Sequence, residues 1–410
     1  MNPQPVISFD NTEFAFQYKS TKELKRAHFL FSSMGKPWLL NLGLKITPFA
    51  IKWHLPFTKT VIRATLFEQF VGGETLDETA KVADKLEKYG VNVILDYGVE
   101  GGHNGEPGFE QSTDEFIRVI NYAATQKNIP FMSIKVTGLS RFGLLEKLDA
   151  SMHVGQGSLM KRYQQAIDNL PGEEKEEWQR VVDRLMRISE IAAGKNVGVL
   201  IDAEETWIQD PVDALTILMM AKFNKEKSVV YNTLQLYRHD RLQFLKDSYE
   251  AAVEKKFILG AKLVRGAYME KERLRAAEMG YTSPIQQDKE STDTDFNACV
   301  EFCIEHINNI GLIVASHNEY SNLLAVQLLQ KKGLPLKHPH IHWSQLYGMS
   351  DNITFNLAHA GCSVSKYLPF GPIKDVVPYL MRRAQENSSV AGQTGRELGL
   401  IEKEMRRRKG

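Results

Sequence analysis

Two adjacent arginines near the end of the sequence have the residue types and spacing of a carboxylate-binding site. They belong to the segment YLMRRAQEN, in which four residues spaced i, i+3, i+4 and i+7 would share one helical face: Tyr379, Arg382, Arg383 and Glu386. Two guanidinium groups can bind both oxygens of a carboxylate, and a nearby glutamate can hold one of them in place. The alternative is a solvated basic face with an ordinary helical ion pair.

Polar residues also end eight short apolar segments elsewhere in the chain. The segments are VNVILDY, FMSIKVTG, VGVLIDAEE, VVYNTLQLY, ILGAKLVRG, GLIVASHN, HIHWSQLYG and CSVSKYLPFG. Each begins with apolar residues and ends with polar ones, among them Lys135, Asp202, Lys262, Arg265 and Tyr367. The carboxyl ends of parallel barrel strands meet at one face, where barrel enzymes place their active sites. The pattern therefore predicts an enzyme.

Helical patterns fill the intervals between these segments. One example runs from residue 291 to 311, with Ser291 or Thr292 as its expected N-cap and Gly311 as its expected end. Regular alternation of strand and helix favours parallel strands. Eight such units favour a closed (βα)8 barrel of the α/β class over an open sheet.

The chain length suits one large domain with an appendage, since 410 residues can bury a large core. We expect a helical arm over residues 1–90, the barrel over 91–395 and a basic tail over 396–410. The interval from about 143 to 196 is too long for one crossover helix, so extra helices are expected there.

Composition narrows the classes of protein. Lys and Arg total 51 and Asp and Glu total 50, a net charge of +1, so no nucleic-acid partner is expected. Three cysteines favour a reducing compartment over a disulfide-bonded secreted domain. The N-terminal MNPQPVISFDNTEFAF has neither an apolar signal core nor an Arg-rich presequence. We therefore expect a cytoplasmic protein, or a mature form.

A basic stretch near the N-terminus has two interpretations. From Leu24 to Phe67 there is no Asp or Glu. Basic residues alternate there with apolar segments; they are Lys25, Arg26, Lys36, Lys45, Lys52, Lys59 and Arg63. The stretch could rest on anionic lipid, with Trp38 and Phe57 at headgroup level, on the inner face of the membrane. Alternatively, it is a helical arm packed on the main domain.

Metal and nucleotide motifs do not account for the chemistry. The sequence has no G-x-G-x-x-G after a strand, no G-x-x-x-x-G-K-[ST], no G-x-S-x-G and no H-E-x-x-H. The histidines of HPHIHW stand at the start of the seventh segment, away from the catalytic end of a barrel. Cys299, Cys303 and His306 share one helical face, where core packing is the better interpretation than zinc. No metal is expected.

Six segments resemble, in order, the strand-end motifs of the proline dehydrogenases, flavoenzymes built on a distorted (βα)8 TIM-type barrel. They are SIKVTGL, IDAEE, LQLY, KLVRGAY, ASHN and YLPFGP with YLMRRAQEN, between about residues 60 and 395. The resemblance implies FAD bound across the carboxyl ends of the strands. It implies oxidation of L-proline to Δ1-pyrroline-5-carboxylate, the first step of proline catabolism to glutamate. Hydride would pass to FAD, and the electrons to a membrane quinone.

The resemblance also implies a substrate site. Lys135, Arg382 and Arg383 would hold the proline carboxylate. Glu386 would orient the two arginines. The walls around the proline ring would be Leu263, Tyr268, Tyr367 and Tyr379.

The catalytic and cofactor residues follow from the same resemblance. Asp202 would be the buried carboxylate beside the site, and Lys262 stands where many members carry an arginine near flavin N5. That departure puts the contact with reduced flavin in question. The FAD contacts would be Ala203, Gln235, Arg265, Gly266, Ala267, Ser316, His317 and Asn318.

Several alternatives stay open. Members that prefer hydroxyproline tend to have a small polar residue where Tyr367 stands, so this tyrosine should favour proline over hydroxyproline. A non-catalytic, membrane-associated barrel is a second alternative. A metal-dependent barrel hydrolase is a third, but the end of the first segment, LDYGVE, lacks the His-x-His it needs. The length leaves no room for the aldehyde dehydrogenase domain of bifunctional relatives, so transient contact with a separate pyrroline-5-carboxylate (glutamate semialdehyde) dehydrogenase is expected.

Overall fold

The computed structural model describes residues 7–34, 53, 60, 62–98, 105–389 and 393–410, without the side chains of 386–389, 393 and 394. Its eight parallel strands follow sequence order around a closed barrel. They are β1 (Asn92–Tyr97), β2 (Phe131–Ile134), β3 (Gly198–Ile201), β4 (Val230–Gln235), β5 (Leu259–Val264), β6 (Ile310–Ala315), β7 (Ile341–Leu346) and β8 (Val364–Phe370). Each overlaps one of the eight predicted segments, so the predicted (βα)8 fold is confirmed.

The chain groups into two compact units. One comprises residues 1–98 and 343–410, and the other comprises residues 99–342. The boundaries expected at residues 90 and 395 stay predictions.

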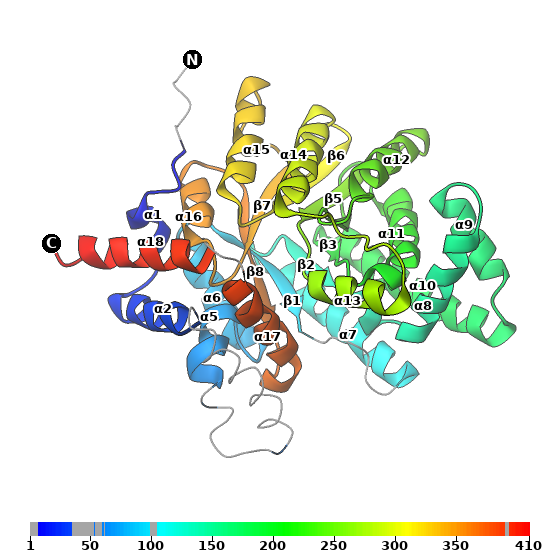
Figure 1. Ribbon diagram of the computed structural model, residues 1–410, viewed down its shortest axis with the longest axis horizontal. Helices are drawn as coiled ribbons and strands as arrows, with labels where there is room; N and C mark the ends of the chain where they lie inside the picture. The colour runs from blue at the N-terminus through cyan, green and yellow to red at the C-terminus, as the bar shows by residue number, and fades with distance from the viewer. Residues whose placement is uncertain (1–6, 35–52, 54–59, 61, 99–104, 390–392) are drawn as a thin grey trace. The chain divides into compact units, whose positions relative to one another are not determined.

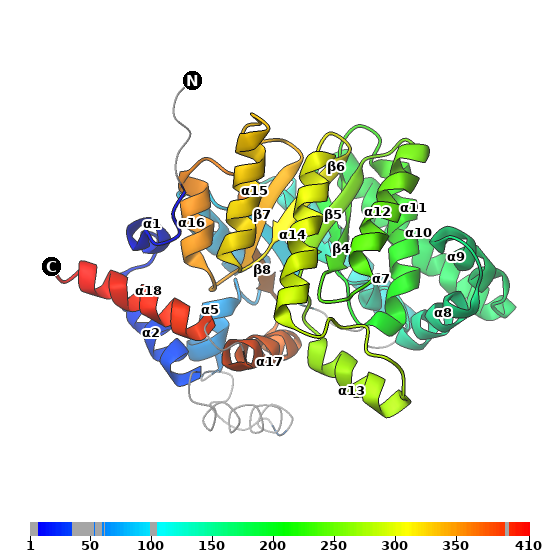
Figure 2. The ribbon, with the colours of Figure 1, turned by 45° about the horizontal axis from the view of Figure 1, so that its top comes forward.

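The unit of residues 99–342 pairs strands β2 to β6 in parallel. Its helices are α7 (Glu106–Ala123), α8 (Phe142–Val154), α9 (Leu159–Asp168), α10 (Gly172–Lys195), α11 (Gln209–Phe223), α12 (Arg241–Glu254), α13 (Met269–Met279), α14 (Lys289–Glu305) and α15 (Glu319–Lys331). Helices α12 and α14 lie side by side in Figure 2. Helices α8 to α10 fill the interval for which extra helices were expected.

The prediction for α14 was wrong at both ends. The N-cap is Asp288, whose carboxylate accepts from the Ser291 backbone N–H at 2.7 Å. Asp is a strong cap for the same reason as Ser or Thr, because its side chain satisfies a free N–H of the first turn. The helix ends at Glu305, and Gly311 lies in β6. A Cβ on Gly311 would meet Ser228 Oγ at 2.2 Å, so close packing explains this glycine.

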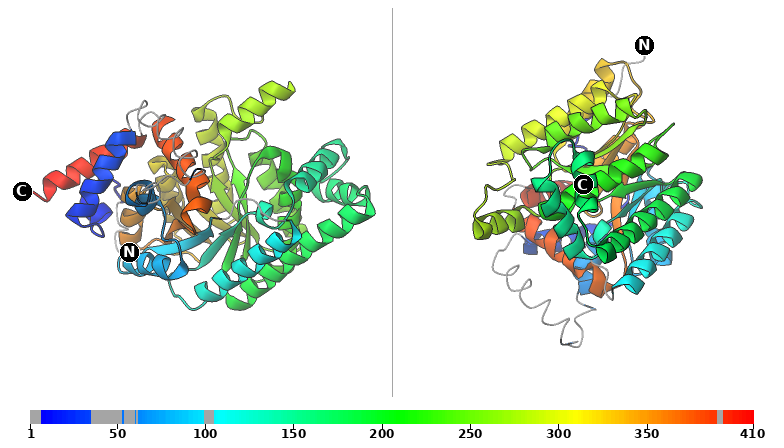
Figure 3. Two further views of the ribbon diagram at one scale, coloured as in Figure 1. Left: turned by 90° about the horizontal axis from the view of Figure 1, so that it is seen from below. Right: turned by 90° about the vertical axis from the view of Figure 1, so that its right-hand side faces the viewer.

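The unit of residues 1–98 and 343–410 holds β1, β8 and helices from both ends of the chain. The helices are α1 (Thr12–Phe16), α2 (Thr21–Met34), a π-helical turn (Arg63–Phe67), α5 (Glu68–Phe70), α6 (Leu76–Glu87), α16 (Asp351–His359), α17 (Ile373–Ser389) and α18 (Gln393–Arg407). Helices α2 and α18 pack on each other, as Figures 1 and 3 show. They share a hydrophobic cluster with α17 that includes Leu24, Phe31, Phe70, Leu380 and Ile401.

The N-terminal arm is therefore packed into the protein at α2, whose buried face carries Leu24 and Phe31. Several other basic and aromatic residues of the arm lie outside the described residues; they are Lys36, Trp38, Lys45, Lys52, Phe57 and Lys59. Contact of the arm with lipid stays a prediction. None of the helices in the described part of the chain is long and apolar enough to span a bilayer.

Candidate functional site

A carboxylate with two lysines stands at the carboxyl ends of strands β2, β3 and β5. Asp202 follows β3, Lys135 follows β2, and Lys262 lies near the end of β5. Asp202 Oδ1 accepts from Lys262 Nζ at 2.5 Å and from Ser133 Oγ at 2.6 Å. Asp202 Oδ2 accepts from Lys135 Nζ at 3.2 Å. The structure therefore brings together three of the predicted site residues, and we call them with Ser133 the Asp202 cluster.

The Asp202 cluster is charged and almost enclosed. Burial alone would raise the pKa of Asp202, but the ammonium groups of Lys262 and Lys135 outweigh it and hold this pKa well below its usual value. Asp202 is thus an anion at neutral pH, and it compensates the charge of the two lysines. Its side chain is 13% exposed, so the cluster is still open to a small molecule.

A second layer of buried polar groups fixes the loop that carries Asp202. Thr137 Oγ1 donates to Glu204 Oε2 at 2.8 Å, two residues along from Asp202. The backbone N–H of Glu204 donates to Gln209 Oε1 at 3.0 Å, and Gln209 Nε2 donates to Asp213 Oδ1 at 2.8 Å. Sequence reasoning missed Ser133, Thr137, Gln209 and Asp213 as supports. Ser133 and Thr137 lie within the segment SIKVTGL, and Gln209 and Asp213 belong to no motif, so only spatial contact reveals their supporting role.

Three of the predicted cofactor residues meet at the ends of β5 and β6. Arg265 donates to Ser316 Oγ at 2.6 Å, and the backbone N–H of Asn318 donates to the same oxygen at 3.1 Å. Asp293 accepts from Arg265 Nε at 2.8 Å. Burial lowers the pKa of Arg265 from its usual value, and Asp293 opposes that shift. The guanidinium also lies 4.4 Å from the centre of the Phe296 ring.

Two further observations bear on whether a flavin fits this chain. Gln235 is buried at the end of β4, and its Oε1 has no hydrogen-bond partner among the described residues. A buried amide oxygen without a partner is costly, and a ligand N–H would satisfy it. Gly266 and Ala267 are exposed just after β5, and a Cβ on Gly266 would meet the Tyr237 ring at 2.5 Å. The residues present fit a large heterocyclic cofactor.

The other predicted positions in this unit are spread around the same strand ends. Leu263 is buried in β5 beside Lys262, and Tyr268 is the N-cap residue of α13. Ala203 and His317 are half-buried in the loops after β3 and β6. Asn318 caps α15 by accepting from the Ser321 backbone N–H at 3.1 Å.

The predicted carboxylate clamp belongs to the other unit and lies on α17, as its helical spacing predicted. Arg383 and Tyr379 are buried, and the Arg383 guanidinium lies 5.2 Å from the centre of the Tyr379 ring. Arg382 is half-buried, and so is Tyr367 in β8. The side chain of Glu386 lies outside the described residues, so its role as an orienting group stays a prediction.

The residues set aside as metal ligands have other contacts. His340 Nδ1 is 2.7 Å from the backbone oxygen of Ile307, and burial lowers the pKa of His342 to about 3. Cys299 and Cys303 are buried in α14.

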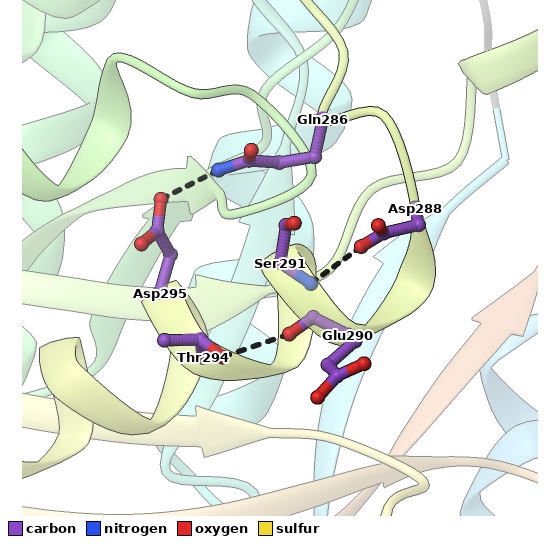
Figure 4. A pocket seen from close by; sticks show the side chains of 6 residues that line it. All are labelled: Gln286, Asp288, Glu290, Ser291, Thr294 and Asp295. Carbon is purple, nitrogen blue, oxygen red and sulfur yellow. Dashed lines mark hydrogen bonds between the residues drawn. The ribbon is translucent and has the colours of Figure 1, made fainter.

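A hollow beside the start of α14 contains none of the predicted residues (Figure 4). It is lined by Gln286, Asp288, Glu290, Ser291, Thr294 and Asp295. Gln286 donates to Asp295 across it at 2.6 Å. This hydrogen bond and the Asp288 cap show that the residues lining the hollow are used to form the start of α14.

The chain is similar in sequence to one family over most of its length. A family model described as proline dehydrogenase matches residues 79–396. Proline dehydrogenase 1, mitochondrial, of Caenorhabditis elegans is 29% identical, over 98% of this chain and 88% of that protein. Hydroxyproline dehydrogenase of Xenopus laevis is 32% identical, over 99% of this chain and 91% of that protein.

Solved structures share the fold. Proline utilization A from Bdellovibrio bacteriovorus, inactivated by N-propargylglycine, superposes with a TM-score of 0.70 at 19% identity and covers 94% of this chain. This chain spans 40% of that much longer protein, so the likeness speaks for the fold alone. The family model and the Xenopus relative carry the assignment. The chain is an oxidoreductase and belongs to the proline dehydrogenase family.

Proposed function

We propose that this protein is a flavin-dependent proline dehydrogenase that oxidises L-proline to Δ1-pyrroline-5-carboxylate. The observation that carries the proposal is the Asp202 cluster, in which two ammonium groups surround a carboxylate at the strand ends of a barrel of this family. A purely structural barrel has no need of these charges at its catalytic end.

The protein's own residues bind and orient the substrate. Arg382, Arg383 and Lys135 bind the proline carboxylate, because cations in an enclosed site hold an anion strongly. Asp202 holds the side chains of Lys135 and Lys262 in place, so little rearrangement is needed when substrate binds. The ring nitrogen must be neutral when hydride leaves the adjacent carbon, so its extra proton departs to solvent first. Leu263, Tyr268, Tyr367 and Tyr379 wall the ring and exclude water.

The cofactor in this proposal is FAD, which when bound accepts the hydride and passes the electrons on. Gln235, Arg265 and Ser316 hold it, together with the backbone at Ala203, Gly266, Ala267, His317 and Asn318. The electron acceptor in this proposal is a membrane quinone, reached by peripheral contact. The product passes to a separate pyrroline-5-carboxylate dehydrogenase.

The visible spectrum of the purified protein tests this proposal. It is recorded anaerobically before and after addition of L-proline. Bleaching of a flavin band by proline supports cofactor, reaction and substrate together. A colourless protein that does not take up FAD would contradict the proposal and favour a non-catalytic barrel.

Hydroxyproline oxidation is a second candidate, favoured by the similarity to the Xenopus hydroxyproline dehydrogenase. Against it, a tyrosine at position 367 would crowd a ring hydroxyl. The same spectrum recorded with trans-4-hydroxy-L-proline separates the two candidates. Faster bleaching by hydroxyproline than by proline would reverse the order.

A further inference from the structure

A second carboxylate with two lysines is buried in the unit of residues 1–98 and 343–410. Asp351, the first residue of α16, lies 2.9 Å from Lys366 Nζ and 3.0 Å from Lys19 Nζ. Tyr18 OH donates to its Oδ2 at 2.8 Å. We call these four residues the Asp351 cluster. The Lys366 side chain is completely buried, which is rare for lysine and requires specific partners.

Lys366 also fixes the loop between β7 and α16. Its Nζ donates to the backbone oxygen of Met349 at 2.5 Å and to that of Leu346 at 3.4 Å. In this loop Ser350 has φ of +50°, a conformation that L-residues adopt only when their surroundings enforce it. The ammonium group binds Asp351 and the backbone oxygens of Leu346, at the end of β7, and Met349, in the loop, and so helps to hold this conformation.

The arm and the last helix hold the same loop from other sides. Gln69 donates to the backbone oxygen of Gly348 at 2.7 Å, and a Cβ on Gly348 would lie 2.0 Å from Gln69 O. The backbone N–H of Ser350 donates to Glu397 of α18 at 2.5 Å. The loop therefore depends on contacts from β8, the arm and α18 together.

This loop is joined directly to Tyr367. The backbone N–H of Tyr347, the first loop residue, donates to Tyr367 O at 2.9 Å. Lys366 and Tyr367 are neighbours in β8, and successive side chains of a strand point to opposite faces. The lysine thus anchors one face of β8 while the tyrosine side chain occupies the other.

We propose that Lys366, held by Asp351 and Lys19, is a positioning residue for Tyr367 and sets how strictly the enzyme prefers proline to trans-4-hydroxyproline. The inference rests on the proposed function. It gives the arm a role in specificity, because Tyr18 and Lys19 belong to the cluster that holds β8 at Lys366. A loosened Tyr367 would admit a ring hydroxyl that the fixed side chain crowds.

The test combines kinetics with hydrogen exchange of the full-length, FAD-loaded protein. In Lys366→Met, the ratio of kcat/KM for proline to that for hydroxyproline should fall about tenfold, the size of effect expected from a changed contact with one small group. Amide exchange in peptides covering residues 343–371 should become faster. Lys19→Met removes an outer member of the cluster and should change both quantities in the same direction by less.

Two further variants separate positioning from general damage. Tyr367→Ser should lower the ratio, and adding Lys366→Met to it should lower the ratio no further, because the tyrosine transmits the effect. Arg26→Met breaks the ion pair of α2 with Glu68 and should leave both ratio and exchange unchanged.

The possible outcomes distinguish a positioning role of Lys366 from general damage to the protein. An unchanged ratio in Lys366→Met, or an equal further fall in the Tyr367→Ser background, overturns the proposal even if exchange is faster. If Lys366→Met does not fold, Lys19→Met decides in its place. If the unsubstituted protein oxidises neither substrate, the proposed function fails, and unchanged exchange in Lys19→Met would then overturn the anchoring role separately.

Discussion

The Asp202 cluster and the Asp351 cluster have the same composition and different surroundings. Each has an aspartate held by two lysines and one hydroxyl group, from Ser133 in the first and Tyr18 in the second. The Asp202 side chain is 13% exposed, whereas that of Asp351 is 3% exposed. The first is built from the ends of β2, β3 and β5, and the second joins the arm to β8 and α16.

This difference shows that the same charged groups serve binding or architecture according to what encloses them. At Asp202 the carboxylate is partly open to solvent, and in the proposed function a substrate anion approaches the lysines there. At Asp351 the lysine donors are used on loop carbonyls, and the lysines hold the pKa of Asp351 at about 2 although burial alone would raise it. Loss of a charged partner should therefore affect mainly activity in the Asp202 cluster and mainly stability in the Asp351 cluster.

Asp351→Ala should give the largest effect, a loss of folding stability, and it tests the structural role of the Asp351 cluster. It leaves Lys366 buried without its counter-charge, and removal of one partner from a buried ion pair typically costs about 3–5 kcal/mol. Thermal and urea unfolding of the FAD-loaded protein would measure the loss. A melting temperature within a degree of the unsubstituted protein would contradict a structural role.

Arg383→Met tests whether the buried guanidinium of Arg383 serves binding, as proposed for the Asp202 cluster, or architecture, as in the Asp351 cluster. If Arg383 binds the proline carboxylate, the change should raise KM for proline by the equivalent of about 2–5 kcal/mol. FAD content and the melting temperature should stay the same, because the charge of Arg383 is needed to bind substrate and not to stabilise the fold. Proline titrations and the flavin spectrum provide both readouts. Unchanged affinity for proline would remove Arg383 from the site.

Asp202→Asn tests the proposed binding role of the Asp202 cluster. The substitution keeps the size of the side chain and removes the charge that compensates Lys135 and Lys262. Because the group is partly solvated, we expect the lower end of the range for a broken charge pair, about 2 kcal/mol, or roughly a 30-fold fall in kcat/KM. Steady-state kinetics would measure it beside the melting temperature. A larger loss of stability than Asp351→Ala causes would reverse the comparison.

The sequence predicted one cluster and not the other, for physical reasons. Lys135, Asp202 and Lys262 each end an apolar segment, and barrel geometry brings such ends together. Lys366 stands next to Tyr367 in the same kind of position, but its partners Lys19 and Asp351 come from segments with no motif. A helical arm packed on the main domain was one of the two interpretations of the basic stretch. The residues that the arm contacts could not be predicted, because they depend on tertiary packing and not on the spacing of residues in the sequence. The predicted N-cap of α14 was wrong because Asp288, Ser291 and Thr292 are all good N-cap residues, and local sequence does not rank them.

The pH dependence of stability gives the smallest effect per step and separates Glu397 by sign from the aspartates of the two clusters. Glu397 is buried against the Asp351 cluster. Burial and the Asp351 charge raise its pKa to about 7, while the Ser350 N–H, Lys366 and Lys19 lower it. A carboxyl whose folded pKa is raised contributes stability that is fully present below its unfolded pKa, near 4.5, and lost as pH rises through 7. Asp202 and Asp351, with lowered pKa values, lose their contributions in the opposite direction, as pH falls through the acid range.

Glu397→Gln isolates this contribution. One proton corresponds to at most about 1.4 kcal/mol per pH unit, so the unsubstituted protein should lose stability relative to Glu397→Gln between pH 4.5 and 7 with no more than that slope. Urea unfolding of both proteins at half-unit pH steps measures the difference. Glu402→Gln on the half-exposed face of α18, where Glu402 contacts His28, is the matched control and should run parallel to the unsubstituted protein. If Glu397→Gln also runs parallel, Glu397 is ionised in the folded protein, and α18 is held to the Asp351 cluster by charge, as Lys366 is.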